Sequence, residues 1–370
     1  MLNLYIAGGC QEHGRNCFVL EMDAFNIMVD CGIIEGSATS YYPELSKEQI
    51  IKTKYLFLTH SHKDHTGALV WLIKNGFCGK IISTEETRLQ VGIHYDNWMV
   101  PILKEQQKQN ENWLPELKFI CGRSGHCIGS IWILFLINTK KILFTGDYSE
   151  QSEFYYCDHI RGITADCAVV DCAYGNDIKN MNQAKKQIND CISDRNHRVK
   201  LFPVPKYGRS LEILFIVGSI ADNTKIYADE LLIQQVENNA YGWHGSLSQI
   251  RICNIKKWDG KEALIFLSDP QLKEISSKEL VDRVIQKSGE IIFSGYVYKN
   301  TYAEELMKKG LAKKIDYPVH MDYESVCRMV RNNRFKRVIP NHAKHVIIDE
   351  KHVMTKLNTG DSICLMNGGE

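Results

Sequence analysis

The sequence contains no apolar run that approaches the roughly 18 residues needed to span a membrane as a helix. Residues 1–17 lack the basic segment and the long apolar stretch of a signal peptide. The formal net charge is only +1, so any contact with a polyanion would depend on a local patch. No internal repeat or low-complexity tract stands out. These absences argue against membrane and fibrous classes of protein.

Closely spaced cysteine pairs are also missing. The chain has 13 cysteines, an odd number, and no C-x-x-C pair, which argues against a disulfide framework and against a cysteine-type structural zinc site. A reduced, cytoplasmic location is therefore expected. At 370 residues and 44% hydrophobic content, the chain is long enough for one large domain or two interleaved domains.

Histidines are concentrated in one short stretch, "THSHKDHTGAL" at residues 59–69. The apolar run Tyr55–Leu58 before it is typical of a buried strand, and the spacing after it is typical of a helix, so the cluster lies on a strand-to-helix loop. Such loops carry the chemistry of layered α/β folds. Imidazoles and carboxylates suit zinc, and manganese or iron less specifically. The tight H-x-H-x-D-H spacing disfavours the alternative of a merely solvated polar loop.

Two later segments offer further ligands. "SGHCIGS" presents His126 between glycines, and "KILFTGDYS" presents Asp147 after an apolar strand. Taken alone, each would be an ordinary loop or turn residue. Their order after the first cluster resembles the metallo-β-lactamase superfamily. That resemblance implies two Zn²⁺ ions, with Mn²⁺ as the alternative metal. It assigns His60, His62 and His126 to one metal, Asp64 and His65 to the other, and Asp147 to a bridge.

Residues 199–345 resemble the β-CASP nucleases of that superfamily. "LFPVPKYGRSLEIL" is similar to their proline-aromatic-glycine-arginine-glutamate segment. "VVDCAYG", "VHMD" and "IPNHAKH" fall in the order of three further motifs and offer Asp171, His320 and His342. The opening "IAGGCQEHGRNCFVLE" is similar to the start of ribonuclease J and its relatives. The resemblance covers about residues 4–348 and implies a minimal catalytic core.

The resemblance also implies roles for these side chains. Two metals would lower the pKa of a bridging water and neutralise the phosphate charge. Asp64, one of the metal ligands, is also predicted to be a catalytic residue. His342 would complete the shell of the second metal. His320 would act as general acid, and Asp171 would accept a hydrogen bond from it. The sequence departs from the family pattern at Ala343 and Lys344, which replace the usual Gly-Glu, at Asp171, where the longer glutamate is common, and in "VHMD", which lacks the usual Ser-Gly or Ser-Ala before the histidine.

Substrate contacts are predicted on Lys206, Arg209 and Ser294, which would meet the phosphates of single-stranded RNA or single-stranded DNA in a cleft between the two modules. Arg209 is the strongest of the three, since a surface lysine is usually only a solvated charge. Asp30, which ends the strand "IMVD", is expected to support the metal loop, or else to be a turn residue.

The expected fold is an α/β protein, a metallo-β-lactamase αββα sandwich with an inserted β-CASP domain of mostly parallel sheet flanked by helices. Expected boundaries are 1–175 for the first part of the sandwich, 176–315 for the insert and 316–370 for the return segment. A long helix is expected over roughly Glu85–Asn112. No membrane contact is expected, and a homodimer is left open.

The expected function is a zinc-dependent ribonuclease that cleaves RNA as an endonuclease, with 5′-exonuclease action left open. Three alternatives remain: a phosphodiesterase acting on DNA or a nucleotide signal, a catalytically silent RNA-binding subunit, and a small-ester hydrolase. The filled ligand positions disfavour the silent subunit, and residues 199–345 disfavour the ester hydrolase.

Overall fold

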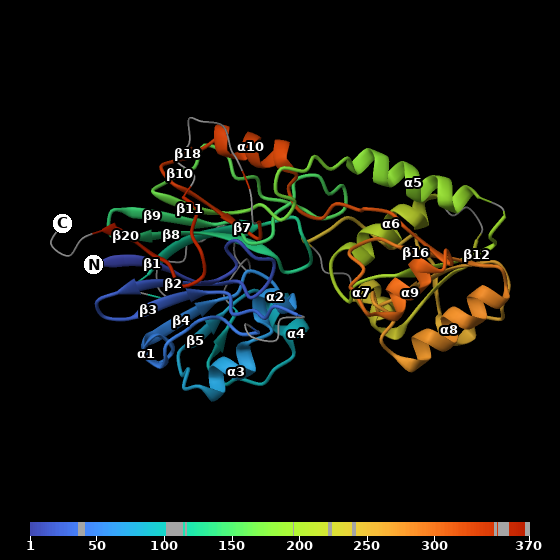
Figure 1. Cartoon of the computed structure of the whole chain (residues 1–370), viewed down its shortest axis with the longest axis horizontal. Coiled ribbons are helices and arrows are strands. Elements are labelled where there is room, and N and C mark those ends of the chain that lie inside the picture. The colour runs from blue at the N-terminus through green and yellow to red at the C-terminus, as the bar shows by residue number, and fades with distance from the viewer. Residues whose placement is uncertain are drawn as a thin grey trace. The chain divides into compact units, whose positions relative to one another are not determined.

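The computed structural model describes residues 1–35, 41–100, 114, 117–194, 196–220, 224–238, 242–343, 346 and 355–366. It divides into two compact units (Figure 1). Unit 1 comprises Met1–Gln151, Cys157–Lys179 and His320–Glu370, and unit 2 comprises Ser152–Tyr156 and Asn180–Val319. Among the described residues, no helix combines the length and the apolar character needed to cross a bilayer. All 13 cysteines lie in the described part of the chain, and all are free thiols.

The first sheet of unit 1 has seven strands in the order β20-β1-β2-β3-β4-β5-β6. Strands β20, β1, β2 and β3 pair antiparallel, whereas β3, β4, β5 and β6 pair in parallel. Their bounds are β1 Leu2–Gly8, β2 Cys17–Met22, β3 Asn26–Val29, β4 Thr53–Phe57, β5 Lys80–Ile82, β6 Trp98–Met99 and β20 Ser362–Met366. The helices of this half are α1 Lys47–Lys52, α2 Lys63–Thr66, α3 Leu69–Lys74 and α4 Glu85–Val91.

The second sheet of unit 1 has five strands in the order β19-β11-β9-β8-β7. Strands β7, β8 and β9 form an antiparallel meander, and β9, β11 and β19 are parallel neighbours. The bounds are β7 Lys118–Arg123, β8 Ile131–Ile137, β9 Lys140–Phe144, β11 Cys167–Asp171 and β19 Val338–Asn341. A small parallel pair, β10 Thr164–Ala165 with β18 Arg334–Phe335, and the helix α10 Tyr323–Arg331 complete this half.

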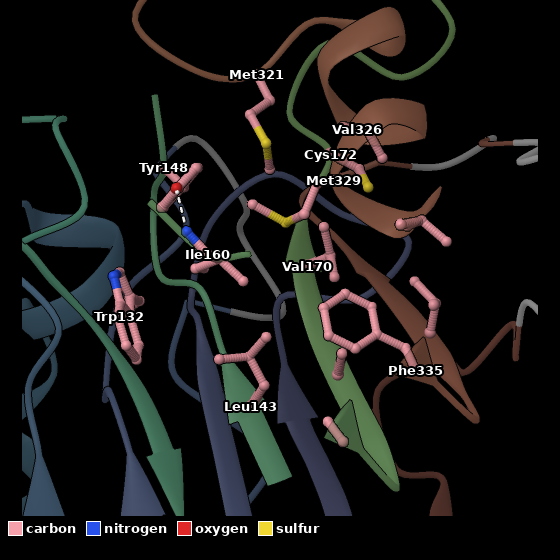
Figure 2. Packing of buried hydrophobic residues seen from close by; sticks show 14 of the residues in the cluster. Trp132, Leu143, Tyr148, Ile160, Val170, Cys172, Met321, Val326, Met329 and Phe335 are labelled. Carbon is pink, nitrogen blue, oxygen red and sulfur yellow. Dashed lines mark hydrogen bonds between the residues drawn. The ribbon is translucent and has the colours of Figure 1, made fainter. Parts of the chain in front are cut away.

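Aromatic side chains join the two sheets of unit 1. Phe57 of β4 packs edge-on against Phe119 of β7 and Phe135 of β8, with ring centroids 5.0 and 4.9 Å apart. On the far face of the five-stranded sheet, Val170 and Phe335 belong to a second core that includes side chains of α10, drawn in Figure 2. Burying each large apolar side chain stabilises the fold by about 1.5–3 kcal/mol. The layers confirm the expected αββα sandwich.

Unit 2 contains a six-stranded, fully parallel sheet in the order β14-β13-β15-β12-β16-β17. The strands are β12 Val199–Pro203, β13 Ile226–Ala228, β14 Ile252–Asn254, β15 Ala263–Leu267, β16 Glu290–Phe293 and β17 Ala312–Lys314. The helices are α5 Met181–Ser193, α6 Arg209–Ile220, α7 Glu230–Glu237, α8 Ile275–Gln286 and α9 Tyr302–Lys308, with a short 3₁₀ turn at Ile255–Lys257. This arrangement confirms the expected parallel sheet with crossover helices.

The connections of unit 2 run toward both edges of its sheet. The connections through α6 and α7 lead toward the β14 edge, whereas those through α8 and α9 lead toward the β17 edge. Right-handed crossovers therefore place these two pairs of helices on opposite faces. Within unit 2, Figure 1 shows α5 and α6 on one side of the strands and α8 on the other.

The long helix expected over Glu85–Asn112 is wrong in its length. Helix α4 ends at Val91 because Gly92 takes the left-handed conformation, with φ of 67°, and its N–H donates to the Arg88 carbonyl. The chain then forms β6, which pairs with β5. Residues 101–113 lie outside the described part of the chain. A polar, helix-favouring composition indicates the length of a helix only weakly, and a glycine cap can end the helix earlier.

Candidate metal centre

The histidine-rich loop begins directly after β4, at the carboxyl end of that strand. His62 is the N-cap of the short helix α2, which carries Asp64 and His65 on its first turn. The loop packs tightly on Gly32, where an added Cβ would lie 1.7 Å from the Asp64 carbonyl oxygen. Glycine is therefore required at this contact for the loop to adopt this position.

Three parallel strands of the second sheet deliver three further groups. Strands β9, β11 and β19 end close to Asp147, Asp171 and His342 respectively, and Asp171 is paired in register with Asn341. Carboxyl ends of adjacent parallel strands meet at one edge of a sheet, which brings these side chains together. His126 comes from the turn between β7 and β8.

Three histidines and one carboxylate oxygen form a first group of donors. The His62 Nδ1 atom lies 3.1 Å from the Nε2 atoms of both His60 and His126. The Oδ2 atom of Asp147 lies 3.4 Å from His60 Nε2 and 3.3 Å from His126 Nε2. All four atoms therefore surround one point.

The other oxygen of Asp147 faces a second group. Its Oδ1 atom lies 3.1 Å from His65 Nε2 and 3.5 Å from His342 Nε2. The Oδ2 atom of Asp64 lies 3.7 Å from the same His65 nitrogen. The two oxygens of Asp147 thus point into two different donor groups, which is the geometry of a bridging carboxylate.

These donor spacings fit zinc. Zn–N and Zn–O bonds of about 2.0–2.1 Å in a tetrahedral site place neighbouring ligands about 3.3–3.4 Å apart. The ligand atoms of His60, His62, His126 and Asp147 are separated by 3.1–3.4 Å over the four distances above. The donor set of imidazoles and carboxylates belongs to the borderline class that binds divalent transition metals. The cluster therefore supports divalent metal binding.

Unpaired buried atoms point to the same conclusion. Asp147 Oδ1 and both ring nitrogens of His342 are buried, and each makes no hydrogen bond within the described residues. A buried polar atom left unpaired costs about 1–3 kcal/mol. A bound cation would remove that cost, because it would take up the carboxylate oxygen and one imidazole nitrogen.

Electrostatics keep most of these groups in the protonation states that metals require. Burial lowers the pKa of His342 to about 4 and that of His60 well below its ordinary value, so both imidazoles stay neutral. Burial alone would raise the pKa of Asp147, but the surrounding histidines outweigh it and hold that pKa well below the ordinary range. A neutral imidazole and an ionised carboxylate are the forms that ligate metals.

Asp30 supports the site through its contacts with Thr59 and His65. Its Oδ1 accepts from the Thr59 N–H at 2.8 Å, and its Oδ2 accepts from the Thr59 hydroxyl and lies 2.7 Å from His65 Nδ1. This contact leaves His65 Nε2 directed at Asp147, as a carboxylate partner of a ligating histidine does. Asp30 and His342 both have positive φ, 60° and 68°, and strained backbone of this kind clusters at functional sites.

His320 lies at the edge of the cluster and is hydrogen-bonded to the Asp171 carboxylate. Its Nδ1 is 2.9 Å from Asp171 Oδ2, so the shorter aspartate still reaches the histidine. Asp171 also accepts from the backbone N–H groups of Tyr148 and Ala173, which fixes its own position. Burial alone would lower the pKa of His320, but Asp171 and Asp147 outweigh it and raise that pKa to about 9.

The sequence predicts no role for two residues near the cluster, Asn16 and His13, which lie in the loop between β1 and β2. The Nδ2 atom of Asn16 lies 3.0 Å from His65 Nε2 and donates to the Asp64 carbonyl. His13 forms a group with Asp64 and His342 in which the ligand atoms lie within 4.8 Å of one another. Both lie in the segment Glu12–Asn16, whose residue pattern does not specify these contacts.

The predicted substrate residues lie in unit 2. Arg209 begins α6, Lys206 is exposed in the loop before it, and Ser294 follows β16 and is buried. Arg209 and Ser294 are brought close, because the Arg209 guanidinium packs on Gly295. The nine predicted metal-ligand and catalytic positions all belong to unit 1.

Known proteins resemble this chain along most of its length. Residues 11–168 match the Metallo-beta-lactamase superfamily. The RNase J-like protein of Methanocaldococcus jannaschii is 24% identical over 94% of this chain and 92% of its own length. Cleavage and polyadenylation specificity factor 73 of Drosophila melanogaster is 28% identical over 93% of this chain and 60% of its own. Endoribonuclease YSH1 of Gibberella zeae is 24% identical, over 82% and 44%.

The chain thus spans nearly the whole archaeal relative but about half of the two eukaryotic ones. A solved structure of a protein of unknown function from Enterococcus faecalis V583 superposes with a TM-score of 0.65. That match covers 98% of this chain and 99% of the other at 11% identity, so it bears on the fold alone.

Proposed function

Because this chain is a member of the metallo-β-lactamase superfamily with β-CASP nucleases among its relatives, we propose that it is a zinc-dependent ribonuclease that hydrolyses RNA phosphodiesters. The observation that carries the proposal is the orientation of Asp147. Its Oδ2 faces His60 and His126, and its Oδ1 faces His65 and His342, at distances of 3.1–3.5 Å. This supports a site for two cations.

We assign His60, His62, His126 and Asp147 Oδ2 to one Zn²⁺ ion, and Asp64, His65, His342 and Asp147 Oδ1 to the other, with Mn²⁺ as the alternative metal. When bound there, the pair of cations would neutralise phosphate charge and lower the pKa of a water molecule. Asp147 would hold the two positions at a fixed separation. Asp30 would hold His65 in the tautomer with Nε2 directed at the cluster.

His320 would supply the proton that the leaving ribose oxygen requires. Its Nδ1 is held by Asp171, which leaves Nε2 as the nitrogen that can donate to substrate. The Asp171 carboxylate stabilises the imidazolium and raises the pKa of His320, which favours the protonated form that a general acid requires. Asp171 is therefore a positioning residue that acts through His320.

The substrate is RNA in this proposal, in line with the names of the relatives, and single-stranded DNA is the alternative. Lys206, Arg209 and Ser294 are proposed to contact its phosphates, because each lies at the carboxyl edge of the unit 2 sheet. The domain boundaries at 175 and 315, a cytoplasmic location and a homodimer stay predictions.

The test is cleavage of labelled single-stranded RNA by metal-replete protein, with 5′-triphosphate, 5′-monophosphate and circular substrates side by side. We expect cleavage that His62→Ala and Asp147→Asn each abolish, and a cut circle would establish endonuclease action. Single-stranded DNA at equal concentration separates the two polymers, because the 2′-hydroxyl is read locally. Intact RNA after prolonged incubation with zinc and with manganese would refute the proposal.

A further inference from the structure

Two tyrosines are displayed on the loop that follows β16. Tyr296 is 66% exposed and Tyr298 is 43% exposed, so both rings are accessible to solvent. Their rings are neighbours, with centroids 5.2 Å apart and planes inclined by 72°. The exposed aromatic surface is therefore a pair rather than a single scattered residue.

A buried glutamine fixes the backbone that carries both rings. Gln271, only 5% exposed, donates from Nε2 to the Tyr296 carbonyl at 2.8 Å, and its Oε1 accepts from the Tyr298 N–H at 2.9 Å. The Thr301 hydroxyl donates to the Tyr298 carbonyl at 2.7 Å. Because hydrogen bonds hold the backbone of both tyrosines, binding of a ligand to the rings would cost little backbone conformational entropy.

The topology of the sheet places this loop where ligands bind. Strands β12 and β16 are parallel neighbours, but the chain leaves β12 toward β13 and leaves β16 toward β17. Connections that diverge from adjacent strands form a switch point at the carboxyl ends of those strands, the usual ligand position in open α/β sheets. Arg209 follows β12 and Tyr296 follows β16, so the two residues lie on either side of this switch point.

Contacts at this switch point suit a polyanion. The Arg209 guanidinium packs so closely on Gly295 that an added Cβ would lie 1.9 Å from its Nη2. The Ser294 hydroxyl is buried and makes no hydrogen bond within the described residues. Lys206 and Lys299 are exposed on the same two loops. Cationic and hydroxyl donors beside exposed rings are the combination that single-stranded nucleic acids require.

We propose that Tyr296 and Tyr298 form a stacking site for nucleobases of single-stranded RNA, next to phosphate contacts made by Arg209 and Ser294. This inference rests on the proposed nuclease function and adds a base-contacting site that lies wholly within unit 2. A protein partner is the less favoured occupant, because the two loops on either side of the switch point carry Lys206, Arg209 and Lys299. Stacking of one base on an aromatic ring corresponds to about 5- to 150-fold in affinity.

The experiment measures RNA binding without cleavage. A short fluorescently labelled single-stranded RNA is titrated with chelator-treated protein, and Kd is read from fluorescence anisotropy. Tyr296→Ala and Tyr298→Ala are expected to raise Kd about 5- to 150-fold, whereas Tyr→Phe at either position retains binding because the ring remains. Leu311→Ala is the matched control, since Leu311 is 41% exposed and lies at the opposite, amino end of β17.

The Kd for an abasic RNA of the same length gives a second readout. Stacking predicts that the alanine variants bind it as the unchanged protein does, because only the phosphate contacts remain. If both alanine variants bind intact RNA unchanged while the unchanged protein cleaves RNA, the stacking site is refuted and the nuclease function stands. If the unchanged protein neither binds nor cleaves RNA, both fail. A change of oligomeric state at unchanged Kd would identify a protein interface instead and would refute the stacking site.

Discussion

Replacing Glu212 with glutamine is expected to change how the stability of unit 2 depends on pH. Glu212 lies on α6 within an apolar run and is only 4% exposed. Its carboxylate accepts from the Ser152 hydroxyl at 2.7 Å. Burial raises the pKa of Glu212 from its ordinary value of 4.5 to about 7, and the nearby Ser152 hydroxyl and Lys185 ammonium offset burial only in part.

The sign and size of the effect follow from this shift. The folded state favours the protonated acid, so the stabilising contribution is fully present below pH 4.5 and is lost as pH rises through about 7. A shift from 4.5 to about 7 corresponds to roughly 3 kcal/mol. Glutamine resembles the protonated acid and cannot ionise. Relative to the unchanged protein, Glu212→Gln should therefore gain about 3 kcal/mol between about pH 4 and pH 8.

The assay is urea unfolding followed by tryptophan fluorescence at several pH values, with chelator present so that metal binding adds no stability. Glu279→Gln is the matched control, because Glu279 is exposed on α8 of the same unit. The pH profile of the Glu279→Gln difference serves as the baseline for the Glu212→Gln difference. A Glu212→Gln difference that follows this baseline would refute the burial of Glu212.

Three further outcomes are expected. His320→Gln should lower RNA cleavage about 10²–10⁴-fold while bound metal stays unchanged, and Asp171→Asn should lower it in the same direction, with cleavage rates and metal content as the readouts. Asp30→Asn should weaken metal affinity about 10–100-fold in a competition titration with a chelating dye, because His65 loses its carboxylate partner. Gly295→Ala should weaken RNA binding with metal content unchanged, because a Cβ would displace the neighbouring guanidinium.

The part of the site that depends on local pattern could be predicted from the sequence. The H-x-H-x-D-H spacing and its position after an apolar strand place four side chains on one loop. The strand endings of β9, β11 and β19 delivered Asp147, Asp171 and His342 because carboxyl ends of adjacent parallel strands converge. Asp30 was predicted to support the metal loop from its position at the end of strand β3, and the structure confirms its hydrogen bonds to Thr59 and His65.

Features that depend on distant backbone contacts could not be predicted. His13 and Asn16 reach the cluster because their loop folds back through left-handed conformations at Gln11, Gly14 and Arg15, which a residue pattern does not specify. The link from Gln271 to the tyrosine loop joins segments about 25 residues apart in sequence. The excessive length predicted for α4 arose because composition outweighed the capping role of Gly92.

The central claim is that one buried carboxylate holds two divalent cations in place. The most direct test is equilibrium titration of chelator-treated protein with zinc, comparing the unchanged chain with Asp147→Asn. The account predicts two tightly bound zinc ions per unchanged chain and a loss of stoichiometry or affinity in the variant, since the amide nitrogen cannot replace the second oxygen. An unchanged chain that binds no zinc, or a variant with the same stoichiometry and affinity, would contradict it.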